Sequence, residues 1–175
     1  MSEKVYLSPV MIISNLSELV SSVEKGKCLL GVDYGSKVIG LAVSDPGLVV
    51  ASPLSSIERK KFQHDAQRFM TIMRDRNIGG LVIGLPKNMD GTEGPTAQAA
   101  RAFARNLSRT EGWPQELPVT FWDERLTTAA VERMMISDDM SRKRRDETID
   151  KAAAAYMLQG ALDAARHAQN SHPTH

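Results

Sequence analysis

The apolar part of the chain begins with two short runs that are joined by a very short connection. The first run, KCLLGVDYG, ends at Gly35, and the second, VIGLAVSD, starts after only Ser36 and Lys37. Two apolar runs joined in this way predict an antiparallel β-hairpin. A third strand is expected over 48–57, where Pro53 restricts it to a sheet edge or to an interrupted element.

Helical and strand patterns alternate through the rest of the chain. Apolar residues recur at helical spacing over 62–76 and again after Pro95, and an apolar strand pattern follows each helix, at 79–86 and at 118–124. A short helix at 129–135, capped by Thr127 or Thr128, and a last helix over about 148–167 complete the order. The order predicts an α/β protein whose mixed sheet opens with antiparallel strands.

Length and composition favour one folded domain. The chain has 175 residues, of which 42% are hydrophobic and 25% charged, so neither a disordered nor a fibrous class is favoured. An amphipathic helix at 14–25, capped by Ser14 or Asn15, predicts an N-terminal helical extension over 1–26. We expect the main domain at 27–168 and a flexible tail at 169–175.

Charge and cysteine content restrict the partners and the compartment. The net charge is +1, so contact with nucleic acid would have to come from a local basic patch. The single cysteine, Cys28, excludes a disulfide framework within the chain. The sequence shows no signal peptide and no run approaching ~18 apolar residues, so we expect a cytoplasmic protein without a membrane segment.

Two acidic residues lie at positions of a predicted strand and a predicted helix whose side chains should point toward the interior of the protein. Asp33 ends the first strand just before Gly35, although a turn-forming aspartate is the alternative interpretation. Asp150 continues the apolar stripe of the last helix, which is formed by Ala153, Ala154, Met157 and Ala161. An aspartate that complements the helix dipole would also explain that position.

A third acidic position lies at the end of the 118–124 strand. Strand alternation places Asp123 and Glu124 on opposite faces, so only one of them can face a common site. We favour Glu124, while a β-bulge would exchange it for Asp123. The alternatives are a surface salt bridge between Glu124 and Arg125, or a role for Asp123 as the cap of the next helix.

Carboxylate oxygens without histidine or cysteine favour a hard cation, Mg²⁺ or Mn²⁺. Two such ions roughly 3.5 to 4 Å apart, held by three or four carboxylates, can activate water and stabilise a leaving oxygen. The chemistry that this arrangement favours is phosphodiester hydrolysis.

Taken together, four ordered motifs over about 27–166 resemble the YqgF family, described both as Holliday junction resolvases and as nucleases that mature the precursor of small-subunit ribosomal RNA. The motifs are Asp33-x-Gly35 with Ile39-Gly40-x-Ala42-x-Ser44-Asp45; Gly84-Leu85-Pro86 with Asn88, Gly91, Thr92 and Gly94; Asp123-Glu124-Arg125-Leu126-Thr127-Thr128; and Asp150 with Ala153-Ala154. Any one motif is weak evidence, but four in this order are highly specific.

The resemblance implies an RNase H-like fold, with a mixed five-stranded sheet and helices on both faces. It also implies that Asp33, Glu124 and Asp150 are catalytic metal ligands, with Asp123 or Asp146 as the candidate fourth carboxylate. The expected function is a metal-dependent endonuclease that processes the 5′ end of pre-16S rRNA in ribosome biogenesis. The alternatives are a Holliday junction resolvase acting on branched DNA and a non-catalytic nucleic-acid-binding module.

Two segments are candidates for contact with the nucleic-acid backbone, and an ordinary loop and a solvated charge run are their alternative interpretations. The candidate residues are Lys87, Asn88, Gly91 and Thr92 in the glycine-rich loop, and Arg125, Arg142, Lys143, Arg144 and Arg145 around the basic stretch. Phosphate contacts carry little sequence information, so RNA and DNA are not distinguished. The sequence does not decide between a monomer and a homodimer.

Overall fold

The computed structural model describes residues 11–124 and 142–171, apart from residues 14 and 115, with only the backbone described for 11, 142–151 and 171. Its elements, in chain order, are β1 (Met11–Ile12), α1 (Leu16–Ser22), β2 (Cys28–Asp33), β3 (Val38–Ser44), β4 (Ala51–Glu58), α2 (Phe62–Asp75), β5 (Ile78–Leu85), α3 (Pro95–Ser108), β6 (Pro118–Asp123) and α5 (Arg142–Ser171). The helix expected at 129–135 lies outside the described residues.

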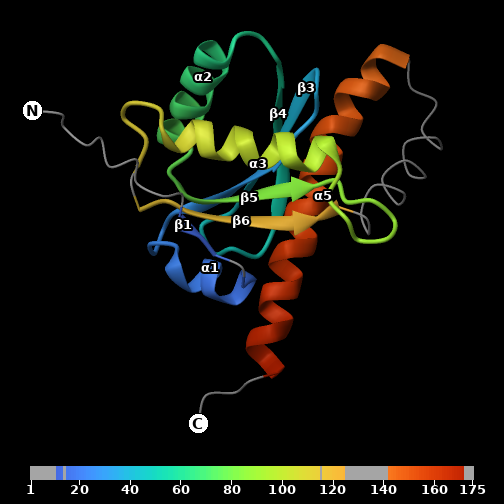
Figure 1. The fold of residues 1–175 in the computed structure, drawn as a ribbon. Helices are drawn as coiled ribbons and strands as arrows, with labels where there is room; N and C mark the ends of the chain where they lie inside the picture. The colour runs from blue at the N-terminus through green and yellow to red at the C-terminus, as the bar shows by residue number, and fades with distance from the viewer. Residues whose placement is uncertain (1–10, 14, 115, 125–141, 172–175) are drawn as a thin grey trace, which may run out of the picture.

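The strands form one mixed sheet in the order β1-β6-β5-β2-β3-β4 (Figure 1). β2 pairs antiparallel with β3 and parallel with β5, and β5 pairs parallel with β6. The predicted hairpin and the mixed sheet are therefore confirmed. β4 is an edge strand, as Pro53 required, and its pairing with β3 is irregular between Leu41 and Ala42.

The N-terminal segment adds a sixth strand to the five that were expected. β1 has two residues, pairs parallel with β6, and is continued by a hydrogen bond from Ile13 N to Val119 O at 2.8 Å. The side chain of Thr120 donates a further hydrogen bond to the carbonyl of Ile13. So short a strand has no periodicity of its own, which is why the sequence did not predict it.

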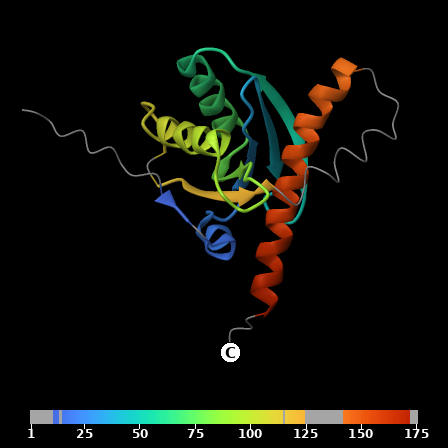
Figure 2. The same ribbon diagram turned by 45° about the vertical axis from the view of Figure 1, so that its right-hand side comes forward.

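Helices cover both faces of the sheet (Figure 2). α2 and α3 pack on one face through Phe69 and Phe103, while α5 packs on the other face through Leu158. Gly31 of β2 lets α5 approach closely, because a Cβ atom there would lie 2.9 Å from Leu158 Cβ. α1 begins after Asn15, whose side chain accepts a hydrogen bond from Ser17 N, and it contacts α5.

α5 is longer than the sequence predicted. It begins at Arg142 instead of about 148 and ends at Ser171 instead of 167. Arginine, lysine and glutamate have high helix propensity, so the basic stretch continues the helix in the N-terminal direction. Within the described part of the chain, every helix is too short or too polar to cross a lipid bilayer.

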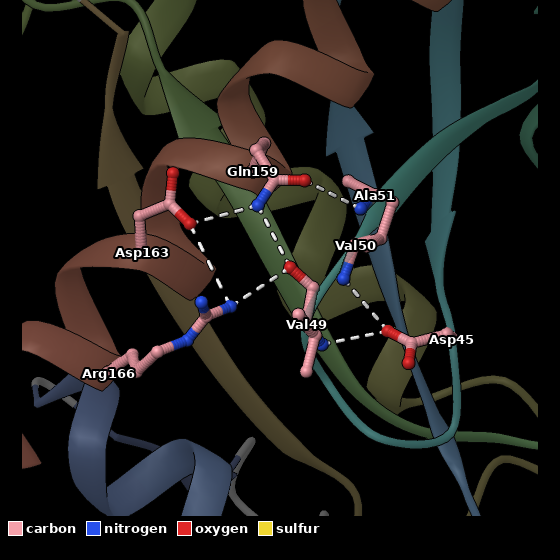
Figure 3. A network of polar contacts seen from close by, with 7 residues as sticks. All are labelled: Asp45, Val49, Val50, Ala51, Gln159, Asp163 and Arg166. Carbon is pink, nitrogen blue, oxygen red and sulfur yellow. Dashed lines mark hydrogen bonds and ion pairs between the residues drawn. The ribbon is translucent and has the colours of Figure 1, made fainter.

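The β3–β4 loop fixes α5 along the sheet (Figure 3). Asp45 organises the loop by accepting hydrogen bonds from the backbone N–H groups of Val49 at 2.7 Å and Val50 at 2.9 Å, which lowers its pKa. Gln159 of α5 accepts from Ala51 N at 2.8 Å and donates to Val49 O at 2.9 Å. This anchor sets which part of α5 lies beside the end of β2.

Candidate active site

Asp33 and Glu124 come together at the carboxyl end of the parallel strands, although β5 lies between the strands that carry them. Asp33 is the last residue of β2, and Glu124 directly follows β6. Gly84 of β5 pairs with Asp33 on one side and with Trp122 on the other. The two acidic side chains therefore meet across Gly84 and form a hydrogen bond with each other.

Gly84 provides the space for this meeting. A Cβ atom at this position would clash with the carboxylate of Glu124 and would lie 2.6 Å from Met157 Sδ of α5. In the sequence, Gly84 stands out only as part of a motif. Its function as an opening in the middle strand follows from the packing of β5, Glu124 and α5.

The alternation of β6 decides which acidic residue points inward. Trp122 packs with the cluster on the α5 face, whereas Phe121 packs with the cluster on the opposite face. Glu124 is two residues beyond Trp122 and reaches Asp33, while Asp123 contributes its negative charge from nearby. The predicted separation of Asp123 and Glu124 onto two faces agrees with this packing.

The pair is electrostatically strained when no cation is bound. The pKa of Glu124 is raised from 4.5 to about 9, first by burial, then by the hydrogen bond and the negative charge of Asp33, and also by Asp123. Glu124 therefore holds a proton at neutral pH. A divalent cation could replace that proton, and an all-oxygen donor set suits Mg²⁺ or Mn²⁺, so these residues fit the predicted metal.

The raised pKa of Glu124 predicts that the metal-free protein loses stability as pH rises from about 4.5 to about 9. In this range the folded chain keeps a proton that the unfolded chain has released, so the free energy of unfolding falls with pH. Below 4.5 both states are protonated, and this contribution is fully present. Urea unfolding in EDTA between pH 5 and pH 9 measures the slope.

The matched variant for that measurement is Glu124→Gln, which keeps the side-chain shape but has no proton to lose. We expect its stability to depend less steeply on pH than that of the wild type over the same range. Equal slopes in the two proteins would show that Glu124 is not the titrating group.

The third predicted ligand, Asp150, lies in α5, one turn before Ala154. The carbonyl oxygen of Ala154 would be 3.3 Å from a Cβ atom on Gly31, and Gly31 lies two residues before Asp33. The side chains of Asp146 and Asp150 lie outside the described residues. Within the described side chains, no three acidic, histidine or cysteine residues form a metal-binding group.

The glycine-rich loop is a closed turn. Gly91 N donates to Asn88 O at 2.9 Å, and Asn88 N donates to Thr92 O at 2.8 Å. Both the backbone N–H and the hydroxyl of Thr92 donate to Asp90 Oδ1. These donors therefore have acceptors within the loop, and phosphate binding by the loop stays a prediction.

An ion pair that the sequence did not predict ties this loop to α3. Arg101 donates to both carboxylate oxygens of Glu93, at 2.8 and 2.6 Å, and its guanidinium lies 4.6 Å from the ring centre of Phe121. The hydrogen bond from Arg101 lowers the pKa of Glu93. Glu93 lies in the loop and Arg101 lies in α3, eight residues later. The sequence did not predict this pair, because the two residues do not share one helix or strand whose periodicity would place them together.

The predicted basic stretch forms the start of α5. The residues Arg142, Lys143, Arg144 and Arg145 belong to its first turns, but their side chains lie outside the described part, as does the whole of Arg125. Lys87 begins the loop after β5 and pairs with Glu93 through an isolated β-bridge.

Comparison with known proteins gives a family and close relatives. The family model described as "RuvX: Holliday junction resolvase" matches residues 27–164. A protein of Rhodospirillum centenum is 59% identical over 89% of this chain and 84% of its own length, and one of Roseobacter denitrificans is 52% identical over 89% and 94%. Both carry the name "Putative pre-16S rRNA nuclease".

A solved structure supports the fold. Thermus thermophilus RuvC in complex with a Holliday junction substrate has a TM-score of 0.52 and 14% identity, covering 79% of this chain and 94% of its own. At such low identity the likeness concerns the fold alone. It confirms the predicted RNase H-like architecture.

Proposed function

Because the chain belongs to the RuvX family of Holliday junction resolvases, we propose that it is a metal-dependent endonuclease whose site is built around Asp33 and Glu124. The observation that carries the proposal is the meeting of these two carboxylates across Gly84, with a proton held where a cation would fit. Both residues are partly buried, and two acidic side chains without a function would not need to meet in a partly buried position.

Asp33, Glu124 and Asp150 would hold Mg²⁺ or Mn²⁺. When bound, such ions supply an activated water and neutralise charge on the cleaved phosphate. Asp33 ends a central strand, and Glu124 and Met157 both lie close to Gly84, so the packing of the sheet positions both donors before the substrate arrives. The proton on Glu124 would leave as the cation binds, so binding should strengthen as pH rises. Either Asp123 or Asp146 would add a fourth carboxylate.

The substrate that we favour is the precursor of 16S rRNA, processed near its 5′ end. The support is the name of relatives that are 59% and 52% identical and cover most of this chain. The description of the family model favours a second candidate, resolution of a four-way DNA junction. A non-catalytic binding module is a third candidate, against which the meeting of the two partly buried carboxylates weighs.

A side-by-side cleavage assay tests the proposal. Wild type and Asp150→Asn are incubated with a pre-16S rRNA fragment and with a four-way DNA junction, each in Mg²⁺, in Mn²⁺ and in EDTA. We expect metal-dependent cleavage of the RNA, and a loss of about 100-fold or more in Asp150→Asn, because a metal ligand is removed.

Each other outcome has a defined meaning. Cleavage of the junction alone would favour the resolvase, and binding without cleavage would favour the non-catalytic module. Full activity in Asp150→Asn would remove that residue from the ligand set. Solution scattering on the same samples would distinguish a monomer from a homodimer, since resolution of a junction favours two sites.

A further inference from the structure

A basic hollow lies beside the turn that connects β2 and β3. Its volume is about 780 Å³, and its lining comes from that turn, the C-terminal end of β4 and the side of α2. Three of the lining residues, Lys37, Arg59 and Arg68, are cationic, and one, Glu58, is acidic. The whole chain has a net charge of only +1, so this is a local concentration of positive charge.

The guanidinium of Arg59 is held in one orientation. Its Nη1 donates to the hydroxyl oxygen of Tyr34 at 2.7 Å and to the carbonyl oxygen of Ser36 at 3.4 Å. The group lies 4.8 Å from the ring centre of Tyr34 and 5.9 Å from that of Phe103. An arginine fixed by stacking loses little conformational entropy when it binds an anion.

The hollow carries an excess of positive charge, because three cationic residues line it against the one carboxylate of Glu58. Within the described residues, Lys37, Arg59 and Arg68 form no ion pair with a carboxylate. The buried Nε of Arg59 also has no hydrogen-bond acceptor in that part of the chain. A fixed, partly desolvated guanidinium without a counter-ion favours an external anion.

The hollow lies at the same end of the sheet as the acidic pair. Tyr34, which supports Arg59, directly follows Asp33, and the backbone N–H of Arg59 donates to Lys37 O at 2.8 Å. β4 is two strands from β2, which at about 4.8 Å per strand gives about 10 Å. The hollow faces α2 and the acidic pair faces α5, so a substrate strand that reaches both must also cross the thickness of the sheet at this end.

We propose that Lys37, Arg59 and Arg68 bind a phosphate of the nucleic-acid substrate within a few nucleotides of the cleaved bond. The nature of this ligand rests on the proposed function. The contact would hold the nucleic-acid backbone on the α2 side of the hairpin, whereas the acidic pair faces α5. One strand of the nucleic acid would therefore cross the end of the β-sheet.

Binding measurements in an Asp33→Asn background, which we expect not to consume the probe, test this inference. The probes are a labelled four-way DNA junction and a labelled hairpin from the 5′ end of pre-16S rRNA, titrated at several salt concentrations. For the exposed pair Lys37→Gln with Arg68→Gln, we expect Kd to rise about 10-fold or more. On duplex DNA the salt slope should fall by ~0.9 for each phosphate that the variant no longer neutralises.

Arg74→Gln is the matched control, because it removes the same charge from the other end of α2, where the side chain is 77% exposed. Its Kd and salt slope should stay at the starting values. Neutral methylphosphonates are placed one at a time at the nucleotides next to the cut. At one of these positions the substitution should weaken binding by the parent protein and have little further effect on the Lys37→Gln and Arg68→Gln protein.

An unchanged Kd and salt slope in the double variant would overturn the inference. Arg59→Gln should show the same loss, and where it does not fold, the exposed pair decides. If the wild type cleaves while the double variant binds normally, only the phosphate site fails. If the wild type binds neither probe, the proposed function fails with it.

Discussion

Replacing Asp33 by asparagine is expected to reduce cleavage by about 10³-fold or more, equivalent to about 4 kcal/mol of transition-state stabilisation at 1.36 kcal/mol per tenfold. Asparagine keeps the size of the side chain but removes the negative charge that a divalent cation would need. Single-turnover cleavage of the pre-16S rRNA fragment in saturating Mg²⁺ or Mn²⁺ measures the loss.

A thermal unfolding measurement separates this loss from damage to the fold. The charge of Asp33 helps to raise the pKa of Glu124, so removing it lowers that pKa and makes ionisation of Glu124 in the metal-free site less costly. We expect the Tm of Asp33→Asn in EDTA to equal or exceed that of the wild type. Asp75→Asn, at the exposed end of α2, is the matched control and should retain full activity. Cleavage by Asp33→Asn within tenfold of the wild type would refute the catalytic assignment.

Replacing Gly84 by alanine is expected to cost about 1–3 kcal/mol in the free energy of unfolding, and about 100-fold in cleavage rate. The added methyl group would meet the carboxylate of Glu124 and the sulfur of Met157, so one or both must move. Urea unfolding and single-turnover cleavage give the two quantities.

Gly94→Ala is the control for the stability measurement. The nearest atoms to a Cβ on Gly94 belong to Asn88 at 3.5 Å, and its φ of −85° suits any residue. Its free energy of unfolding should change by less than about 1 kcal/mol. If the Gly84→Ala protein had wild-type stability and activity, the carboxylate of Glu124 would not need the space that the missing side chain of Gly84 leaves.

The motifs predicted the family correctly. Each combines side chains of a defined chemistry with residues that suit a particular local backbone conformation. The match of the family model over 27–164 confirms the resemblance drawn from Asp33-x-Gly35, the loop after Gly84, the Asp123-Glu124 segment and Asp150. The metal ligands themselves stay a prediction. Phosphate binding by the loop also stays a prediction, because the motif names the glycine and threonine donors while the folded turn chooses their acceptors.

The sequence by itself determined the order of the elements, the hairpin, and the opposite directions of Asp123 and Glu124. These features depend on periods of two and 3.6 residues, which act between near neighbours in the chain. The tertiary structure alone decided that β1 joins the sheet, that Gly84 opens a space for Glu124, and that Arg59 stacks on Tyr34. Those contacts join residues far apart in sequence, and their geometry depends on how whole elements pack.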